Sequence, residues 1–283
     1  MIIWLASYPK SGNTWLRSII SSILYYQKGF KDFSHIDKIK QYPIRSQFRN
    51  LINNYHDINQ IKKKWLASQE IMNLDKKIKI YKTHHINCKI ENYSFTNSEN
   101  TKGVIYVVRD PRNVLVSLKH HFFLKDFESA KDVLFSNDQA LGTDQSKDNV
   151  KETNFLTLIG SWKMHYNSWK NTRENFLLIR YEDLISSPKK EIKKIVVYLN
   201  KFFDCNYSES KIENLIKQTS FERFQKMEND GLFFENVTDK KTGQKRKFFN
   251  LGPQSKWQEI LDPKISNDIL INFKEEMEEL GYI

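Results

Sequence analysis

Four short apolar runs, separated by segments with helical periodicity, constrain the fold of this 283-residue chain more than any other feature. A near-continuous apolar run is typical of a strand buried on both faces of a parallel sheet. Strands that alternate with helices predict βαβ units and an α/β fold in which helices flank a parallel β-sheet. We therefore expect a single domain over residues 1–283. The predicted strands are Ile2–Ala6, Ile78–Tyr81, Val104–Val108 and Phe176–Ile179, and the predicted helices are Thr14–Tyr26, Ile58–Leu74, Asn113–Phe123, Phe155–Trp169 and Lys189–Phe202.

Two long stretches lack a clear period. Residues Phe127–Thr153 are rich in Asp, Ser, Asn and Gly, which predicts a loop or a weak helix. Residues Asn229–Pro253 are basic and punctuated by glycine. Long loops in a compact domain often serve as lids or binding loops.

Polar residues follow each predicted strand directly. The four clusters are Lys10–Thr14, Lys82–His85, Arg109–Arg112 and Arg180–Asp183. Ligands of an open parallel sheet bind at the carboxyl ends of its strands. The convergence of four polar clusters at that edge predicts a ligand site there.

The first cluster has the layout of an anion cradle. Gly12 lets the backbone approach a ligand closely, and the amides of residues 11–15 lie at a predicted helix N-terminus, which favours a negative charge. Ser11 and Thr14 can add hydroxyl donors. The alternative is a serine-capped helix that binds nothing.

The lysine of this cradle stands on the unusual side of the glycine. In the loop of nucleoside triphosphatases the lysine follows the last glycine and precedes a metal-holding Ser or Thr. Here Asn13 occupies that lysine position, Lys10 comes before Gly12, and no metal-holding acidic pair stands out at a strand end. We expect an anion with less charge than a metal-bound triphosphate, and no metal.

The second cluster supplies a candidate base. His84 follows its strand closely and stands two residues after Lys82, and a histidine near its ordinary pKa suits proton removal from an alcohol or phenol. A surface histidine without a catalytic role is the alternative, and spacing alone does not exclude His85 as the base. His120 and His121, on a later helix, are expected to be partly exposed structural residues.

The third and fourth clusters offer further anion and nucleotide contacts. Arg109 leaves its strand where a guanidinium can fork onto a phosphate. Ser117 lies two turns further on and can share that anion only if the helix folds back over the loop. A structural ion pair of Arg109 with Asp110 or Asp183 is the alternative. Tyr181 offers a hydroxyl or a stacking surface beside a base, or is a packed tyrosine at a strand end.

Composition narrows the class of partner and the compartment. The net charge of +11 suits a nucleic acid, an anionic membrane surface or an anionic small ligand. The basic residues are scattered, without the clustered Arg/Lys and interleaved aromatics of a nucleic-acid binder. Two isolated cysteines give neither a zinc pattern nor a disulfide framework. Without an eighteen-residue apolar run or a signal segment, we expect no membrane span and a cytoplasmic protein.

Taken in order, these motifs resemble the sulfotransferases that use 3′-phosphoadenosine 5′-phosphosulfate (PAPS). The run from Tyr8 to Trp15 resembles that family's 5′-phosphosulfate loop, and Val108-Arg109-Asp110-Pro111 through Ser117 resembles its 3′-phosphate motif. Lys82-Thr83-His84 matches the segment with the family's catalytic histidine. Tyr181-Glu182-Asp183 and Thr219-Ser220-Phe221 match further nucleotide-contacting segments. The resemblance runs from Trp4 to about Trp257 and implies the sulfotransferase fold.

The resemblance implies a role for each matched residue. His84 would deprotonate an acceptor hydroxyl, Lys82 would support the sulfuryl oxygens, and Lys10 would stabilise the leaving phosphate. The acceptor would be a small molecule, a lipid or a carbohydrate, and the nucleotide product 3′-phosphoadenosine 5′-phosphate (PAP), with no metal. The residues expected around the nucleotide are Lys10, Ser11, Gly12, Asn13, Thr14 and Trp15 at the 5′-phosphate, Arg109 and Ser117 at the 3′-phosphate, and Tyr181, Thr219, Ser220, Phe221, Phe248 and Gly252, with Trp15 and Phe221 flanking the adenine.

The sequence departs from the family pattern in two places. An Arg-Lys pair is expected before Gly252, but Asn250-Leu251 stands there, so either Lys245, Arg246 or Lys247 replaces it or the 3′-phosphate is held less tightly; we favour replacement. The dimer element of animal members is not visible around residues 256–267, and the oligomeric state stays open. The alternative enzyme class is a P-loop kinase or another nucleotide-dependent phosphotransferase. Candidate acceptor-lining aromatics, which can equally belong to the core, are Phe33, Tyr42, Phe48, Tyr55 and Trp65.

Overall fold

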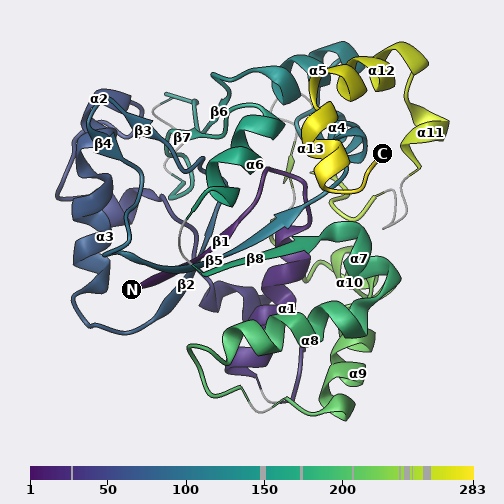
Figure 1. Cartoon of the computed structure of the whole chain (residues 1–283), viewed down its shortest axis with the longest axis horizontal. Helices are drawn as coiled ribbons and strands as arrows, with labels where there is room; N and C mark the ends of the chain where they lie inside the picture. Colours follow the sequence, from purple (N-terminus) through teal and green to yellow (C-terminus); the bar gives the residue numbers. More distant parts are fainter. Residues whose placement is uncertain are drawn as a thin grey trace. The chain divides into compact units, whose positions relative to one another are not determined.

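Two compact units make up the part of the chain that the computed structural model describes, which is residues 1–26, 28–146, 151–172, 175–205, 207–235, 237–238, 243, 245–250 and 256–283. The chain passes between the units several times. Unit 1 consists of Met1–Tyr8, Ile39–Val107 and Phe135–Leu178, and unit 2 of Pro9–Lys38, Val108–Leu134 and Ile179–Ile283. The elements of both are labelled in Figure 1.

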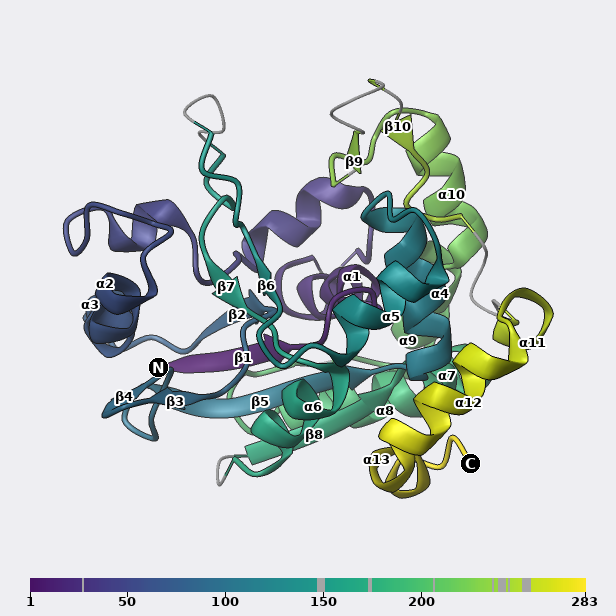
Figure 2. The ribbon, with the colours of Figure 1, turned by 90° about the horizontal axis from the view of Figure 1, so that it is seen from above.

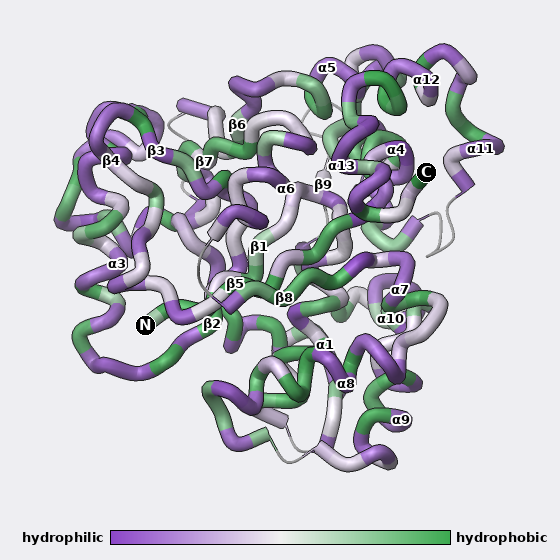
Figure 3. Tube along the Cα trace, viewed as in Figure 1, coloured by the Kyte–Doolittle hydropathy of each residue, from purple (hydrophilic) through white to green (hydrophobic). Residues whose placement is uncertain are grey.

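The four apolar runs form one sheet, as predicted. Its strands are β1 (Ile2–Ala6), β2 (Lys79–Thr83), β5 (Thr101–Val108) and β8 (Asn175–Arg180), in the order β2-β1-β5-β8 (Figures 1 and 2). Strand β1 pairs in parallel with β2 and β5, and Ala6 lies opposite both Thr83 and Tyr106. All five residues of β1 are buried, which explains why the run carries no polar alternation. Figure 3 shows the hydrophobic residues along these strands.

The rest of unit 1 packs large aromatic residues against the sheet. The rings of Trp4 and Tyr42 lie 5.2 Å apart, and those of Trp4 and Phe95 lie 5.6 Å apart. Trp169, on helix α6, is also fully buried at this cluster. The other elements of unit 1 are η2 (Arg45–Phe48), α2 (Ile58–Ile61), η3 (Lys62–Lys64), α3 (Trp65–Asn73), β3 (Lys89–Ile90), β4 (Tyr93–Ser94), β6 (Ala140–Leu141), β7 (Thr157–Leu158) and α6 (Trp162–Lys170).

Unit 2 is built mainly from helices around a phenylalanine cluster. The ring of Phe33 lies 4.9 Å from that of Phe224 and 4.6 Å from that of Phe233, and Phe249 packs on all three. Its elements are α1 (Asn13–Tyr25), η1 (Phe33–Lys38), α4 (Pro111–His121), α5 (Phe127–Phe135), α7 (Tyr181–Ser186), α8 (Pro188–Leu199), α9 (Glu209–Gln218), α10 (Phe221–Asn229), β9 (Val237–Thr238), β10 (Lys245–Arg246), α11 (Trp257–Ile260), α12 (Pro263–Asn272) and α13 (Lys274–Glu279).

Two helix predictions were wrong in extent. The helix predicted over Phe155–Trp169 begins only at Trp162, because Gly160 has a φ of +59° and Ser161 caps the helix by accepting from the Met164 amide. The helix predicted over Ile58–Leu74 is broken into α2, η3 and α3. The break falls on three consecutive lysines, of which Lys62 is buried and paired with Glu91.

The two irregular stretches contain short elements. The first begins with helix α5 and continues to β6, which pairs with β7. In the second, β9 and β10 pair as an antiparallel hairpin. The candidate acceptor aromatics Phe33, Tyr42, Phe48 and Trp65 are fully buried and belong to the cores, and only Tyr55 is half-buried.

Two further searches cover the described ranges only. Within them, every helix is too short or too polar to cross a bilayer. Across the same residues, no three His, Cys, Asp or Glu side chains gather in a group that could hold a metal ion.

Candidate active site

The predicted anion cradle forms a sharp loop into helix α1 in unit 2. Lys10 and Gly12 both have positive φ angles, +68° and +101°, and Gly12 is the N-cap of α1. Glycine has no side chain with which to cap the first-turn amides. The Ser11 hydroxyl is fully buried and finds no hydrogen-bond partner among the described residues. A buried donor at an uncapped helix N-terminus is a site prepared for an anion.

The structure brings three of the four polar clusters together in unit 2. The Arg109 guanidinium lies 4.4 Å from the centre of the Tyr181 ring and donates to the Lys10 carbonyl at 3.4 Å. The Tyr181 ring lies against Gly12, where an added Cβ would come within 2.5 Å of Tyr181 Cδ2. Trp15 meets the same ring edge-on at 5.6 Å. Burial raises the Tyr181 pKa, so this side chain is a neutral phenol.

The Lys10 ammonium contacts a phenylalanine and a histidine of unit 2. It lies 3.7 Å from the centre of the Phe248 ring and 3.3 Å from His121 Nδ1. Phe248 was a predicted nucleotide contact, whereas His121 was expected to be only structural. A signal was present in the sequence, because His121 stands four residues after Ser117 and therefore on the same face of α4.

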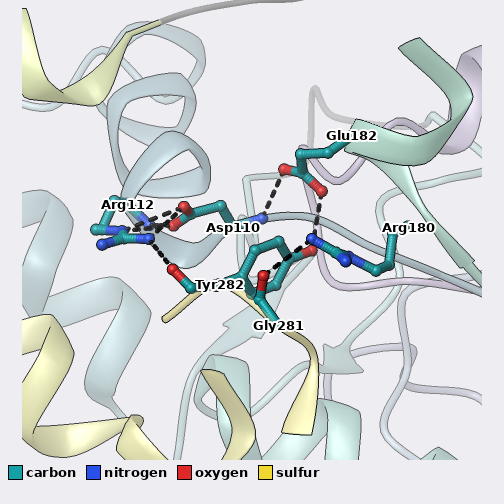
Figure 4. Close-up of polar contacts among 6 residues, drawn as sticks. All are labelled: Asp110, Arg112, Arg180, Glu182, Gly281 and Tyr282. Atoms are coloured by element: carbon teal, nitrogen blue, oxygen red, sulfur yellow. Dashed lines mark hydrogen bonds and ion pairs between the residues drawn. The ribbon is translucent and has the colours of Figure 1, made fainter. Parts of the chain in front are cut away.

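A polar network supports the segment that carries Arg109 (Figure 4). The Asp110 amide donates to Glu182 Oε1 at 3.0 Å, and the Tyr282 hydroxyl donates to Glu182 Oε2 at 2.9 Å. Arg112 donates to the Asp110 carboxylate through two nitrogens, Nε and Nη2, and also donates to the Tyr282 carbonyl at 2.9 Å. Burial raises the pKa of Glu182. The network ties Asp110, which follows Arg109, to Glu182, which follows Tyr181.

The alternative role for Arg109 was a structural ion pair with Asp110 or Asp183. The carboxylate of Asp110 is paired with Arg112 at 2.7 Å. The carboxylate of Asp183 lies 3.9 Å from Arg180. Both carboxylates that offered Arg109 a structural ion pair are therefore held by other arginines.

A carboxylate contacts the first turn of α1. The Thr14 hydroxyl donates to Glu235 Oε2 at 3.0 Å, and Arg17 forms an ion pair with Glu235 at 2.6 Å. Arg17 is buried and also donates to the Ile36 carbonyl. Neither Arg17 nor Glu235 could be predicted as a site residue from the sequence, because the two residues are 218 positions apart and only the fold pairs them.

Most of the other residues predicted to contact the nucleotide are described in unit 2. Thr219 is buried and donates to the Leu215 carbonyl at 2.9 Å, and Ser220 caps α10 by accepting from the Arg223 amide. The Phe221 ring lies 6.0 Å from that of Phe249. The other predicted contacts fall as follows: Asn13 is buried in the first turn of α1, Ser117 is half-buried on α4, and Gly252 lies outside the described residues.

His84 lies in unit 1, just after β2. Its Nδ1 is 2.7 Å from the Ser7 carbonyl and 3.2 Å from the Ser7 hydroxyl. A carbonyl only accepts, so Nδ1 carries the proton and Nε2 is the basic nitrogen of the ring. Lys82 is half-buried and pairs through its backbone with Leu5 of β1.

His85 has the environment of a core residue. Its ring is fully buried and stacks on Phe95 at 4.2 Å, and Nδ1 bonds the Ile86 carbonyl at 2.6 Å. Burial lowers its pKa to about 4. Of the two adjacent histidines, only His84 is partly exposed.

The fold is that of the solved sulfotransferases, a central parallel sheet flanked by helices. Mouse sulfotransferase SULT7A1, solved with PAP, matches with a TM-score of 0.58 at 20% identity, over 98% of this chain and 84% of that one. Retinol dehydratase, solved with androsterone and PAP, matches with a TM-score of 0.59 at 18% identity, over 98% of this chain and 80% of that one.

Sequence comparison assigns the family. The model of the sulfotransferase domain matches residues 2–281, so the chain belongs to the sulfotransferase domain family. Sulfotransferase 1B1 of Mus musculus is 30% identical over 223 residues, which are 78% of this chain and 64% of the relative. Flavonol 3-sulfotransferase of Flaveria bidentis is 24% identical over 90% of this chain and 75% of its own length. The chain thus spans about two-thirds of the mouse relative.

Proposed function

We propose that this protein transfers the sulfuryl group of PAPS to a hydroxyl of a small-molecule, lipid or carbohydrate acceptor. The observation that carries the proposal is the cradle of unit 2, in which Lys10 and Arg109 flank a helix N-terminus with a buried, unpartnered Ser11 hydroxyl. Two cations and a row of amides suit a nucleotide with two separate anionic ends. The two solved proteins named above were crystallised with PAP, which supports the same choice of nucleotide.

The residues present fit this nucleotide. The amides from Ser11 to Trp15 and the Ser11 hydroxyl would hold the 5′-phosphate, and Gly12 leaves no Cβ between the loop and the Tyr181 ring. Arg109 and Ser117 would hold the 3′-phosphate. Arg246 is the best candidate to replace the missing Arg-Lys pair, because it donates to the His120 carbonyl at the end of α4. PAPS, when bound, supplies a sulfuryl group on a good leaving phosphate.

The chain's own residues would then move one proton and stabilise charge. His84 Nε2 would take the acceptor's hydroxyl proton as the acceptor oxygen attacks sulfur. The Lys10 ammonium would stabilise the negative charge that grows on the departing phosphate, and Lys82 the sulfuryl oxygens. Fixed cations and amides that face developing charge contribute most of the rate in such transfers.

Three further statements belong to the same proposal. Both units would form one sulfotransferase domain over residues 1–283, as the reach of the family model supports. The compartment would be the cytoplasm, which the name of the relative Cytosolic sulfotransferase 5 of Arabidopsis thaliana supports. The acceptor hydroxyl is supported by relatives named for flavonol and 3-beta-hydroxysteroid.

A nucleotide titration tests the donor. Melting temperature is followed with PAP and with ATP, each with and without Mg²⁺. Stabilisation by PAP that needs no metal is expected. A preference for Mg-ATP would support the phosphotransferase class and overturn the proposal.

A second experiment tests the base. His84→Ala is expected to abolish transfer from labelled PAPS in an acceptor screen while leaving the PAP-dependent melting shift unchanged. His56→Ala, a half-buried histidine of the same unit that bonds the Gly142 carbonyl, serves as the matched control and is expected to stay active. Activity that survives in His84→Ala would assign the base elsewhere.

A further inference from the structure

We infer that His165, on helix α6 of unit 1, is a positioning residue that holds His84 in place through the backbone carbonyl of His84. This inference rests on the proposed function, in which His84 is the base. His165 is fully buried, and the amino-acid sequence gave no signal for it beyond its place on a predicted helix.

Helix α6 contacts the turn after β2 with two ring donors. His165 Nε2 lies 3.1 Å from the His84 carbonyl, and Trp169 Nε1 donates to the His85 carbonyl at 3.0 Å. The two donors stand four residues apart, so they lie on one face of α6, and they meet two consecutive carbonyls. The Ser168 hydroxyl of the same helix also accepts from the Asn87 amide at 3.0 Å. Helix α6 is therefore the support of this turn.

The hydrogen-bond partners of His165 assign its tautomer. The His84 carbonyl only accepts, so His165 Nε2 carries the proton. Nδ1 then accepts from the Tyr106 hydroxyl, which lies 2.8 Å away. Both rings are buried, and burial lowers the pKa of His165 to about 3, so the imidazole is neutral at neutral pH and carries its one N–H on Nε2.

Two hydrogen bonds thus orient the base from two sides. The Ser7 carbonyl fixes the ring of His84 through Nδ1, and His165 fixes the backbone that carries the ring. Loss of the second bond would free the turn while leaving the ring chemistry of His84 intact. Misplacement of a catalytic group by about 1 Å costs about a hundredfold in rate.

A matched pair of variants tests the role. His165→Gln places an amide N–H near the former Nε2 and keeps the donor to His84, whereas His165→Asn places its amide near the former Nδ1 and loses that donor. We expect kcat to fall about a hundredfold in the Asn variant and less than about tenfold in the Gln variant, with KM for PAPS unchanged in both. Equal loss of kcat in both variants would overturn the inference, because a merely structural role does not distinguish them.

A readout independent of turnover is the ¹⁵N NMR of the imidazoles in the wild-type chain. His165 is expected as the Nε2–H tautomer without titration between pH 5 and 8, and His84 as the Nδ1–H tautomer. The titratable side chains that face His165 among the described residues include Tyr8, Tyr106 and His85, none of which is charged in this range, and His84 meets His165 through its backbone carbonyl. A His165 that titrates, or that carries its proton on Nδ1, would overturn the inference. If these tautomers are found but no acceptor is sulfated, the positioning holds and the proposed function fails.

Discussion

The contact between Gly12 and Tyr181 makes a quantitative prediction about the cradle. Gly12→Ala introduces a methyl group 2.5 Å from Tyr181 Cδ2, at a residue whose φ is +101°. A left-handed backbone costs a residue with a Cβ about 1–2 kcal/mol. Overpacking a buried site adds about 1–3 kcal/mol. The free energy of unfolding is therefore expected to fall by about 2–5 kcal/mol.

Gly231 provides the matched control within the same unit. Its φ is +75°, but a Cβ there would meet no atom within 4 Å. Gly231→Ala is expected to cost only the backbone part, about 1–2 kcal/mol. The difference between the two variants measures the packing of Tyr181 on the loop.

Urea unfolding and PAP titration calorimetry provide the assay. Gly12→Ala also pushes the Tyr181 ring toward Arg109, so its affinity for PAP is expected to fall at least about tenfold, whereas Gly231→Ala keeps it. Equal losses of stability in the two variants would refute the reasoning, because they would mean that no ring lies against Gly12. Unchanged PAP affinity in Gly12→Ala would separate the loop from the nucleotide site.

Three further predictions concern the buried groups. Burial lowers the pKa of His165 to about 3 and of His85 to about 4, so on acidification the unfolded chain takes up protons at a higher pH than the folded chain does. The free energy of unfolding present above pH 6.5 is therefore expected to fall by about 2 kcal/mol for each of the two histidines by pH 5. Urea unfolding at pH 7.5 and 5 checks this, and His165→Gln should remove about half of the loss. Arg109→Ala is expected to weaken PAP binding about tenfold to a hundredfold by calorimetry, and unchanged affinity would place the 3′-phosphate elsewhere. Tyr282→Phe removes a donor from buried Glu182 and should cost about 1–3 kcal/mol in urea at pH 7; no loss would mean that this bond is not formed.

Features with a local cause were predictable from the sequence. The apolar run Ile2–Ala6 is a strand with the predicted bounds, because a strand buried on both faces needs no polar alternation. The cradle from Lys10 to Thr14 could be predicted because its glycine and small polar residues directly precede the periodic pattern of α1.

Features that depend on distant partners were not predictable. The contact of His121 with Lys10 joins residues 111 positions apart; the sequence places His121 on the face of α4 that carries Ser117 but does not indicate Lys10 as its partner. The same holds for Glu235 at the first turn of α1. The helix predicted over Phe155–Trp169 was too long because residues at its start belong to strand β7, which pairs with β6 in a different segment of the chain. Local periodicity cannot distinguish such a strand from a helix.

The backbone of Lys10 is strained. Its φ of +68° is a conformation that glycine adopts freely and that a lysine adopts at a cost of about 1–3 kcal/mol. Natural chains tolerate such strain chiefly where an active site needs it. Under the proposed function, the loop tolerates this strain because transfer needs an ammonium group at position 10, where glycine would relax the backbone. Among related sequences, loss of that lysine to glycine would be the expected mark of a chain released from selection for transfer.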